Sequence, residues 1–372
     1  MDGPDGNAGR SSTPAHDEPD RRRESTVQRS TGCQRLDGTP RSWLARINVI
    51  QRPLHFTLGS LLGDFDTDRF LREIYGRHPL HVPAVDAHRF DSLMSWGELE
   101  RLLNITGYWD ESRLRLMVDG RRVAPERYCF ARSSADGEQR AWRPQPERVM
   151  QAIGHGAALV LNGLDGLSPA ISAIAQALEA QLAVRVQSNL YLSQRSHRGL
   201  PLHYDIHDVL ALQIAGRKQW RLHANRAHPA VKPAPERELR IAAGQVAQQI
   251  TLGPGDFLYL PAGVIHEAFA ETDHAMHLTL AIKQVTPIDL ASLMMKRLAI
   301  RDDLTRPSYD LHEGIDALAR HVARLAEGFS EIARNPAELS SLFSEIEANR
   351  QPRGRYALDP MQQRSERHQP DK

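Results

Sequence analysis

Several features are scarce in this sequence of 372 residues, and each scarcity excludes a class of protein. Only two cysteines are present, Cys33 and Cys129, which is too few for a disulfide framework, so we expect a reducing, cytoplasmic location. No apolar run approaches membrane-spanning length, and the first residues lack the apolar stretch of a signal peptide. The formal net charge of +1 argues against nucleic-acid binding as the main activity.

Composition divides the chain into four parts. Residues 1–50 are rich in Arg, Asp, Ser, Gly and Pro and have few large apolar side chains, so we predict a disordered tail. Residues 51–285 are predicted to form a folded domain, whose core covers residues 184–283. A helical region is expected over residues 286–350, and a second disordered tail over residues 351–372.

Short strand-like segments dominate the core and are separated by turns that contain Gly or Pro. Many such strands at close spacing predict an antiparallel double-sheet barrel. The segments cover residues 184–192, 209–215, 218–223, 249–252, 256–260, 264–268 and 276–282.

Helices and a few strands are expected on either side of this core. On the N-terminal side we expect short helices, a helix that Ser168 caps, and a hairpin at Asp119-Gly120. The sequence therefore predicts a mostly β fold with added α elements. Amphipathic helices are expected from Pro287 and Gly314, and a third opens at Asn335-Pro336. These helices could cover the barrel or form a dimer interface.

The triplet His203-Tyr204-Asp205 and the later segment that ends in His266 together offer two imidazoles and one carboxylate. This is the ligand set of the non-haem Fe(II) oxygenases, which leaves further coordination positions open. Residues two apart on a strand point to the same face, so His203 and Asp205 could reach one ion together. The triplet alone is weak evidence, but its combination with the later segment is much stronger.

Lys218 shares one strand face with Trp220 and Leu222, which are expected to be buried. A buried ammonium group is costly unless an anion pairs with it, and the carboxylate of a bound small molecule would serve. Alternatively, Lys218 lies near the strand end and reaches water. The residues alone leave both readings open.

The strand over residues 184–192 carries polar side chains, including Asn189 and Tyr191, on one face only. These groups either line a pocket or lie on a solvent-exposed face of the sheet.

Four segments resemble the JmjC-type 2-oxoglutarate oxygenases, and within them the cupin-4 or ribosomal oxygenase branch. They are Ser188–Tyr191, Gly199–Asp205, Gln213–Leu222 and Gly255–His266. The resemblance covers most of residues 54–350 and is most specific over residues 186–282. It implies a double-stranded β-helix, which is the cupin or JmjC jelly roll, with N-terminal α/β elements and a helical C-terminal region for dimerisation.

The resemblance also implies roles for particular residues. His203, Asp205 and His266 match the Fe(II) ligands, and Lys218 matches the residue that holds the distal carboxylate of 2-oxoglutarate. No further catalytic residue is implied. Asp208 matches an acidic position that supports the neighbouring loop.

A second group of residues matches positions near the cosubstrate. Asn189 and Tyr191 match an N-x-Y pattern, and His277 and Thr279 match an H-x-T pattern. The sequence departs from the family at Ala281, where many relatives have a serine.

The predicted function is an Fe(II)- and 2-oxoglutarate-dependent dioxygenase that uses O2 to hydroxylate a protein or peptide side chain. Few ordered residues are expected after Arg350, whereas ribosomal oxygenases commonly carry a further domain there, so a free amino acid or natural-product intermediate is the alternative substrate. The substitution at Ala281 supports a third possibility, a metal-binding cupin that oxidises nothing. The expected partners are a substrate and a second copy of the chain, without a membrane or nucleic acid.

Overall fold

The computed structural model describes residues 56–133, 140–195, 200–227, 235–300 and 311–349. All of them belong to one compact unit, Pro53–Lys372. The two predicted tails and Cys33 lie outside the described residues. None of the helices in the described part of the chain is long and apolar enough to cross a membrane.

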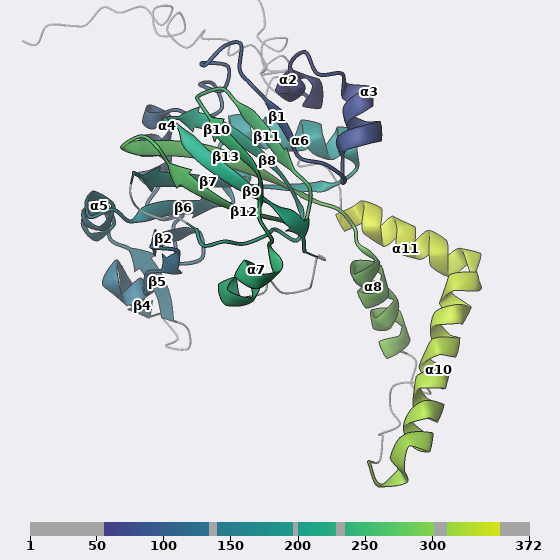
Figure 1. The fold of residues 1–372 in the computed structure, drawn as a ribbon. Helices are drawn as coiled ribbons and strands as arrows, with labels where there is room; N and C mark the ends of the chain where they lie inside the picture. The colour runs from purple at the N-terminus through teal and green to yellow at the C-terminus, as the bar shows by residue number, and fades with distance from the viewer. Residues whose placement is uncertain (1–55, 134–139, 196–199, 228–234, 301–310, 350–372) are drawn as a thin grey trace, which may run out of the picture. The chain divides into compact units, whose positions relative to one another are not determined.

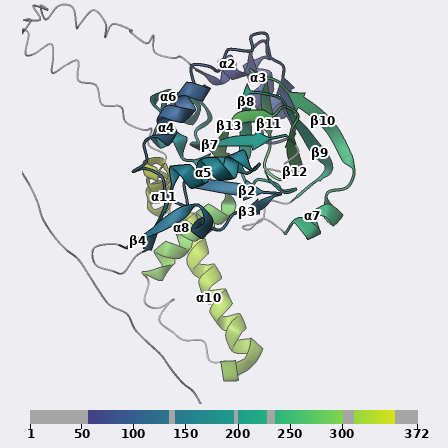
Figure 2. The same cartoon turned by 90° about the vertical axis from the view of Figure 1, so that its left-hand side faces the viewer.

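Two antiparallel sheets form a double-stranded β-helix, as predicted (Figure 1). The larger sheet contains, in spatial order, β1 (Leu80–Val82), β11 (Phe257–Leu260), β8 (Asp208–Ala215), β13 (His274–Lys283), β7 (Arg185–Gln194), β6 (Ala158–Asn162), β2 (Leu114–Val118) and β3 (Arg121–Arg122). The smaller sheet contains β10 (Val246–Leu252), β9 (Lys218–Arg226) and β12 (Val264–Ala270). Figure 2 shows the two sheets as separate layers.

Both faces of the larger sheet are covered, which explains why β8 and β13 are buried along almost their whole length. On the outer face, the main apolar cluster joins strand residues such as Leu210 and Leu280 to helix residues such as Ile174. A smaller cluster lies between the sheets and contains Trp220 and Leu258. The functional residues described below lie on this inner side.

Helices surround the N-terminal half of the fold. They are α2 (Leu58–Leu62), α3 (Thr67–Arg69), a π-helical turn (Phe70–Ile74), α4 (Trp96–Leu103), α5 (Pro146–Gly154) and α6 (Pro169–Leu182), with short 3-10 turns at Pro125–Arg127 and Leu164–Gly166. Ser168 is the N-cap residue of α6, but its side chain makes no capping hydrogen bond. The predicted capping interaction was therefore wrong, although the helix is present.

The hairpin predicted at Asp119-Gly120 joins β2 and β3. Asp119 and Gly120 have φ angles of 50° and 76°, as expected for the two central residues of a tight hairpin turn. A second hairpin contains β4 (Cys129–Ser133) and β5 (Arg140–Pro144).

A helix that the sequence did not predict supports the segment that contains His203. The Pro-rich composition of residues 224–238 is typical of an exposed loop, but β9 extends to Arg226 and α7 (Glu236–Ala242) begins before that range ends. The reason is burial: Leu239 of α7 packs in one cluster with Leu202 and Tyr204, which flank His203.

The C-terminal region is helical, as predicted. It contains α8 (Pro287–Ala299), a 3-10 turn (Leu311–Glu313), α10 (Gly314–Arg334) and α11 (Pro336–Asn349). The three helices pack on one another through Leu298, Ile332 and Leu342. Arg297 of α8 also forms ion pairs with Glu338 and Glu345 of α11.

Candidate metal centre and cosubstrate pocket

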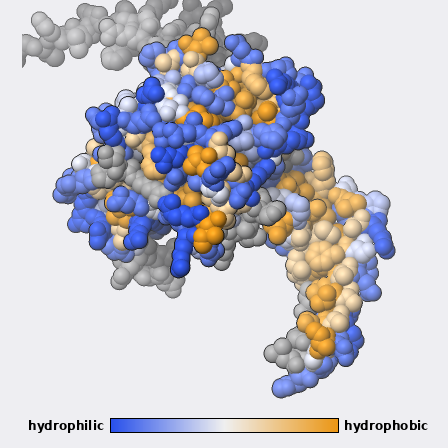
Figure 3. Space-filling model, viewed as in Figure 1, coloured by the Kyte–Doolittle hydropathy of each residue, from blue (hydrophilic) through white to orange (hydrophobic). Residues whose placement is uncertain are grey.

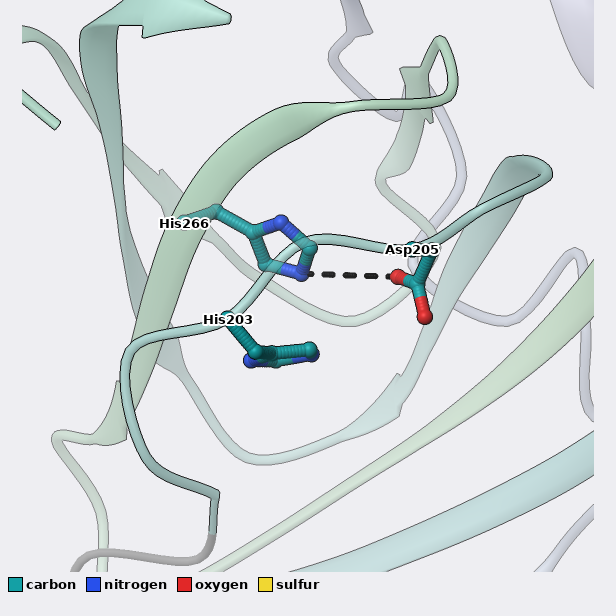
Figure 4. Close-up of side chains that lie close together, drawn as sticks. All are labelled: His203, Asp205 and His266. Carbon is teal, nitrogen blue, oxygen red and sulfur yellow. Dashed lines mark ion pairs between the residues drawn. The ribbon is translucent and has the colours of Figure 1, made fainter. Parts of the chain in front are cut away.

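Three predicted ligands meet at one point inside the jelly roll (Figure 4). One ligand atom each from His203, Asp205 and His266 lies within 4.8 Å of the other two. His266 Nε2 is 3.8 Å from Asp205 Oδ2, and the two imidazole ring centroids are 4.3 Å apart. The structure therefore brings together the three side chains that the two sequence segments predicted.

The backbone around His203 differs from the prediction. The triplet does not lie on a regular strand; it is held by an isolated bridge in which His203 N donates to His266 O at 3.1 Å and His266 N donates to His203 O at 2.8 Å. Gly263 N also donates to Asp205 O at 2.8 Å. These hydrogen bonds join the two backbone segments directly. They, and not a shared regular strand, set the distance between the side chains of the cluster.

Hydrogen bonds orient both imidazoles. His203 Nδ1 lies 2.8 Å from Pro201 O, and His266 Nδ1 lies 2.8 Å from Val264 O. Because a carbonyl can only accept, each Nδ1 carries the hydrogen and each Nε2 keeps a free lone pair. Burial is the main cause that lowers the pKa of His266 to about 4, and the nearby charge of His203 adds to this effect. The lowered pKa keeps this imidazole neutral and able to bind a metal.

Asp208 braces the turn that precedes His266. Its buried carboxylate accepts hydrogen bonds from the Tyr259 hydroxyl at 2.6 Å and from Ala262 N at 2.8 Å. Tyr259 in turn accepts a hydrogen bond from Gly76 N at 2.6 Å. The loop-supporting position that the sequence indicated for Asp208 is therefore observed.

Lys218 extends into the same pocket and does not reach solvent, so the alternative of a strand-end lysine in water was wrong. Only 3% of the residue is exposed. Its Nζ donates to Ser193 Oγ at 2.9 Å and lies 2.9 Å from His277 Nδ1. No carboxylate of the described residues pairs with it, and burial lowers the pKa of Lys218 to about 7.

The register between β7 and β13 builds the polar wall of the pocket. Tyr191 is opposite His277 and Asn189 is opposite Thr279, so alternate residues of the two strands face the same space. The Tyr191 and His277 rings stack with centroids 4.9 Å apart and an interplanar angle of 8°. The predicted residues that line the pocket are His203, Asp205, His266, Lys218, Asn189, Tyr191, His277 and Thr279.

Several other lining residues were not assigned to the pocket from the sequence, and Ser193 and Trp220 are the ones that contact predicted site residues. Ser193 contacts Lys218, and the alternation Asn189, Tyr191, Ser193 could have revealed it. Trp220 was expected only as a core residue; it is buried, but its indole ring also stacks on His266, with centroids 5.6 Å apart. Ala281 lines the pocket as well and offers only a methyl group there.

The tip of the hairpin between β2 and β3 abuts the segment that carries His203. A Cβ atom on Gly120 would lie 3.1 Å from Pro201 N and 3.2 Å from Pro201 Cα, which are backbone atoms that cannot swing away. Because Pro201 O accepts a hydrogen bond from His203 Nδ1, a change at Gly120 should be transmitted to the His203 imidazole.

We expect Gly120→Ala to weaken Co(II) binding roughly tenfold, as changes next to metal ligands commonly do. Gly314→Ala is the matched control, since Gly314 has a φ of 73° but no atom within 4 Å of an added Cβ. Titration of both folded variants with Co(II) would test the effect. Equal affinities in the two variants would show that the hairpin tip does not position His203.

The two facing sheets and the cluster of two histidines and one aspartate define a class: a double-stranded β-helix protein with three side chains that could hold a metal ion from one side. Residues 167–290 match the JmjC domain family. The resemblance that the sequence motifs indicated is confirmed.

Curated relatives are ribosomal oxygenases and similar proteins. A Drosophila persimilis protein named bifunctional lysine-specific demethylase and histidyl-hydroxylase NO66 is 26% identical over 66% of this chain and 34% of its own length. Ribosomal oxygenase 2 of Rattus norvegicus is 39% identical over 60% of this chain and 47% of its own length. The chain thus spans between a third and a half of these two relatives.

A solved structure shares the fold. Ribosomal oxygenase YcfD of Escherichia coli, in complex with cobalt and 2-oxoglutarate, has a TM-score of 0.50 and 19% identity to this chain. The match covers 76% of this chain and 71% of that chain.

Proposed function

We propose that this protein is an Fe(II)- and 2-oxoglutarate-dependent oxygenase that hydroxylates a side chain of a protein or peptide. The observation that carries the proposal is the convergence of His203, Asp205 and His266 in one pocket with a buried lysine. When bound, Fe(II) and 2-oxoglutarate together supply the reduction of O2 that hydroxylates a C–H bond, and succinate and carbon dioxide are released.

The donor set fits a ferrous ion. Both Nε2 atoms and the Asp205 carboxylate would hold the ion, and a set of two histidines and one carboxylate is the ligand set of non-haem Fe(II) oxygenases. The two carbonyls that hold the Nδ1 atoms keep each imidazole in the ligand tautomer. The apolar cluster around Trp220 excludes water from one side of the centre.

Lys218 would hold the distal carboxylate of 2-oxoglutarate. Its ammonium group is buried without a carboxylate partner, so an anionic ligand would relieve the desolvation that now favours its neutral form. Ser193 and His277 fix the position of Nζ. Tyr191, Asn189 and Thr279 offer polar groups on the same wall, where Ala281 cannot donate a hydrogen bond.

The affinity for 2-oxoglutarate should fall as pH rises. Because the pKa of Lys218 in the free protein is lowered to about 7, the lysine must take up a proton to bind the anion at higher pH. We expect the Kd to rise about tenfold per pH unit above roughly pH 7.5. Titrations at fixed, saturating metal measure this, and Lys218→Arg, which does not titrate, is the control. The same fall in the arginine variant would assign the effect to another group.

The substrate class rests on the relatives, whose names state a histidyl-hydroxylase, a lysine-specific demethylase and ribosomal oxygenases. Incubation of the iron-loaded protein with cell extract and 2-oxoglutarate, followed by mass spectrometry, tests it. A protein peptide that gains the mass of one oxygen atom supports the proposal. A modified free amino acid or metabolite, without a modified peptide, would move the substrate to the small-molecule class.

We further infer that the C-terminal helices form a homodimer interface. Apolar side chains gather along α8, α10 and α11 (Figure 3), and Ile288, Ile315 and Phe343 are 58%, 75% and 63% exposed in the single chain. Exposed apolar surface of this kind is typical of an interaction site. Sedimentation analysis of the full chain checks the expected dimer.

A reducing compartment such as the cytoplasm suits the buried thiol of Cys129.

A further inference from the structure

The inner face of the larger sheet continues beyond the pocket onto β6 and β2. Val160 of β6 is opposite Tyr191 of β7, and Arg115 of β2 is opposite Val160. Residues that lie opposite each other in a sheet point to the same face. Val160 lines the pocket, so Arg115 lies on the pocket face, one strand beyond the lining residues.

Arg115 is partly buried and lacks a protein partner among the described residues. Its Nε is buried without a hydrogen bond, and no ion pair of its guanidinium group is found in the described part of the chain. Leaving such a donor unsatisfied is unfavourable, which makes this position suited to a ligand.

Neighbouring arginines are satisfied in the protein itself. Arg113 donates to Tyr108 O at 3.0 Å, and Arg122 donates to Glu111 O at 2.6 Å. Arg143 donates to the carbonyls of Gly107 and Trp109, both at 3.0 Å. Arg115 therefore differs from these three in its bonding and not only in its place on the sheet.

The position of Arg115 is within reach of a substrate held at the metal. Adjacent strands are about 4.8 Å apart, so the backbone of Arg115 is roughly 10 Å from that of Tyr191, and its long side chain spans part of this distance. Burial raises the pKa of Tyr191 to about 12, the charge of Asp205 adds to the rise, and the charge of Arg115 opposes it. The guanidinium charge thus acts at the pocket itself.

We propose that Arg115 binds a carboxylate of the substrate, namely an Asp or Glu side chain that lies near the oxidised residue of a peptide. A guanidinium group pairs with a carboxylate through two parallel hydrogen bonds. An extended peptide advances about 3.3 Å per residue, so the acidic residue would lie about two or three positions from the oxidised one. This inference rests on the proposed function. Lys218, on the facing sheet, remains available for the cosubstrate.

Affinity selection from a random peptide library tests the proposal. The full chain, loaded with Co(II) and 2-oxoglutarate so that it binds without turnover, would be incubated with peptides whose C-termini are amidated. We expect wild type to enrich peptides that contain Asp or Glu. Arg115→Gln should lower this enrichment at least about tenfold, and Arg115→Glu should favour Lys and Arg instead.

Arg121→Gln is the matched control, since Arg121 is exposed on the same hairpin. It pairs with Val118, whose side chain points to the sheet face opposite to that of Arg115. This substitution removes the same charge but should keep the acidic preference. No acidic enrichment by wild type, or equal enrichment by wild type and Arg115→Gln, would overturn the proposal.

Two further measurements distinguish a side-chain carboxylate from a terminal one, and a failure of the Arg115 proposal from a failure of the proposed function. Retention of free amino acids or peptides with free C-termini, but of no amidated acidic peptide, would replace the side-chain assignment with a terminal carboxylate. Binding of 2-oxoglutarate is measured on the same samples. Its absence in wild type would contradict the proposed function, whereas normal binding with an unchanged peptide preference in Arg115→Gln would contradict the role of Arg115 alone.

Discussion

Replacing Asp205 with alanine is expected to lower the affinity for Co(II) by more than about 100-fold and to abolish consumption of 2-oxoglutarate. The variant loses the only carboxylate of the three-residue cluster, and changes of residues that merely support metal ligands already cost about 10- to 100-fold. Isothermal titration with Co(II) measures the first effect, and succinate release measures the second.

The fold should survive this substitution. Asp205 contributes its backbone carbonyl to Gly263 N, which alanine retains, and its side chain is partly exposed. Asp64→Ala, which changes an exposed carboxylate outside the cluster, is the control and should bind metal as wild type does. A folded Asp205→Ala protein with unchanged metal affinity would show that the cluster is not the metal centre.

Lys218→Met is expected to have opposite effects on binding and on stability. Loss of the ammonium group should weaken 2-oxoglutarate binding by about 100-fold or more, since a buried charge-assisted contact is removed. In the absence of ligand, the variant should unfold at a higher temperature, because methionine removes the cost of burying an unpaired amine. Replacement of buried charged groups by apolar ones commonly stabilises by about 1–4 kcal/mol.

The stability that Lys218→Met gains over wild type should become smaller as pH rises. Burial lowers the pKa of Lys218 to about 7, so the unfolded chain binds a proton more readily than the folded chain between this value and the ordinary lysine pKa. The free-energy cost of burying the Lys218 ammonium group in wild type is fully present below about pH 7 and disappears as pH rises towards about 10. The advantage of Lys218→Met should shrink over the same range.

Thermal unfolding without 2-oxoglutarate, over a series of pH values, measures this difference. Lys283→Met is the matched control, because Lys283 is exposed at the end of β13 and should show neither the stability gain nor the loss of binding. A destabilised Lys218→Met protein that still binds 2-oxoglutarate normally would contradict the assigned role of Lys218.

The sequence predicted an antiparallel double-sheet barrel and the cluster of His203, Asp205 and His266 because both depend on local patterns. Alternation of apolar residues marked the strands, and the combination of His203-x-Asp205 with the segment that ends at His266 indicated one centre. The place of Lys218 on an apolar strand face suggested burial but left the solvent-exposed alternative open. The side-chain direction on a strand is fixed by a period of two, which a single sequence displays directly.

Other features depended on partners that lie far away in the sequence. The backbone bridge between His203 and His266 replaces the expected strand, and nothing within the triplet indicates this pairing. Helix α7 forms because Leu239 packs in an apolar cluster with Leu202. Arg115 reaches the pocket face only because β2 pairs with β6, a neighbour that cannot be read from local periodicity.

The most direct test of the central claim is an anaerobic titration of the Fe(II)-loaded protein with 2-oxoglutarate, observed through the visible metal-to-ligand charge-transfer band. The proposed centre predicts that the band develops in wild type and requires at least about 100-fold more 2-oxoglutarate in Lys218→Met. No band in a wild-type protein that demonstrably holds the metal would contradict the assignment and favour a cupin that binds metal without oxidising a substrate.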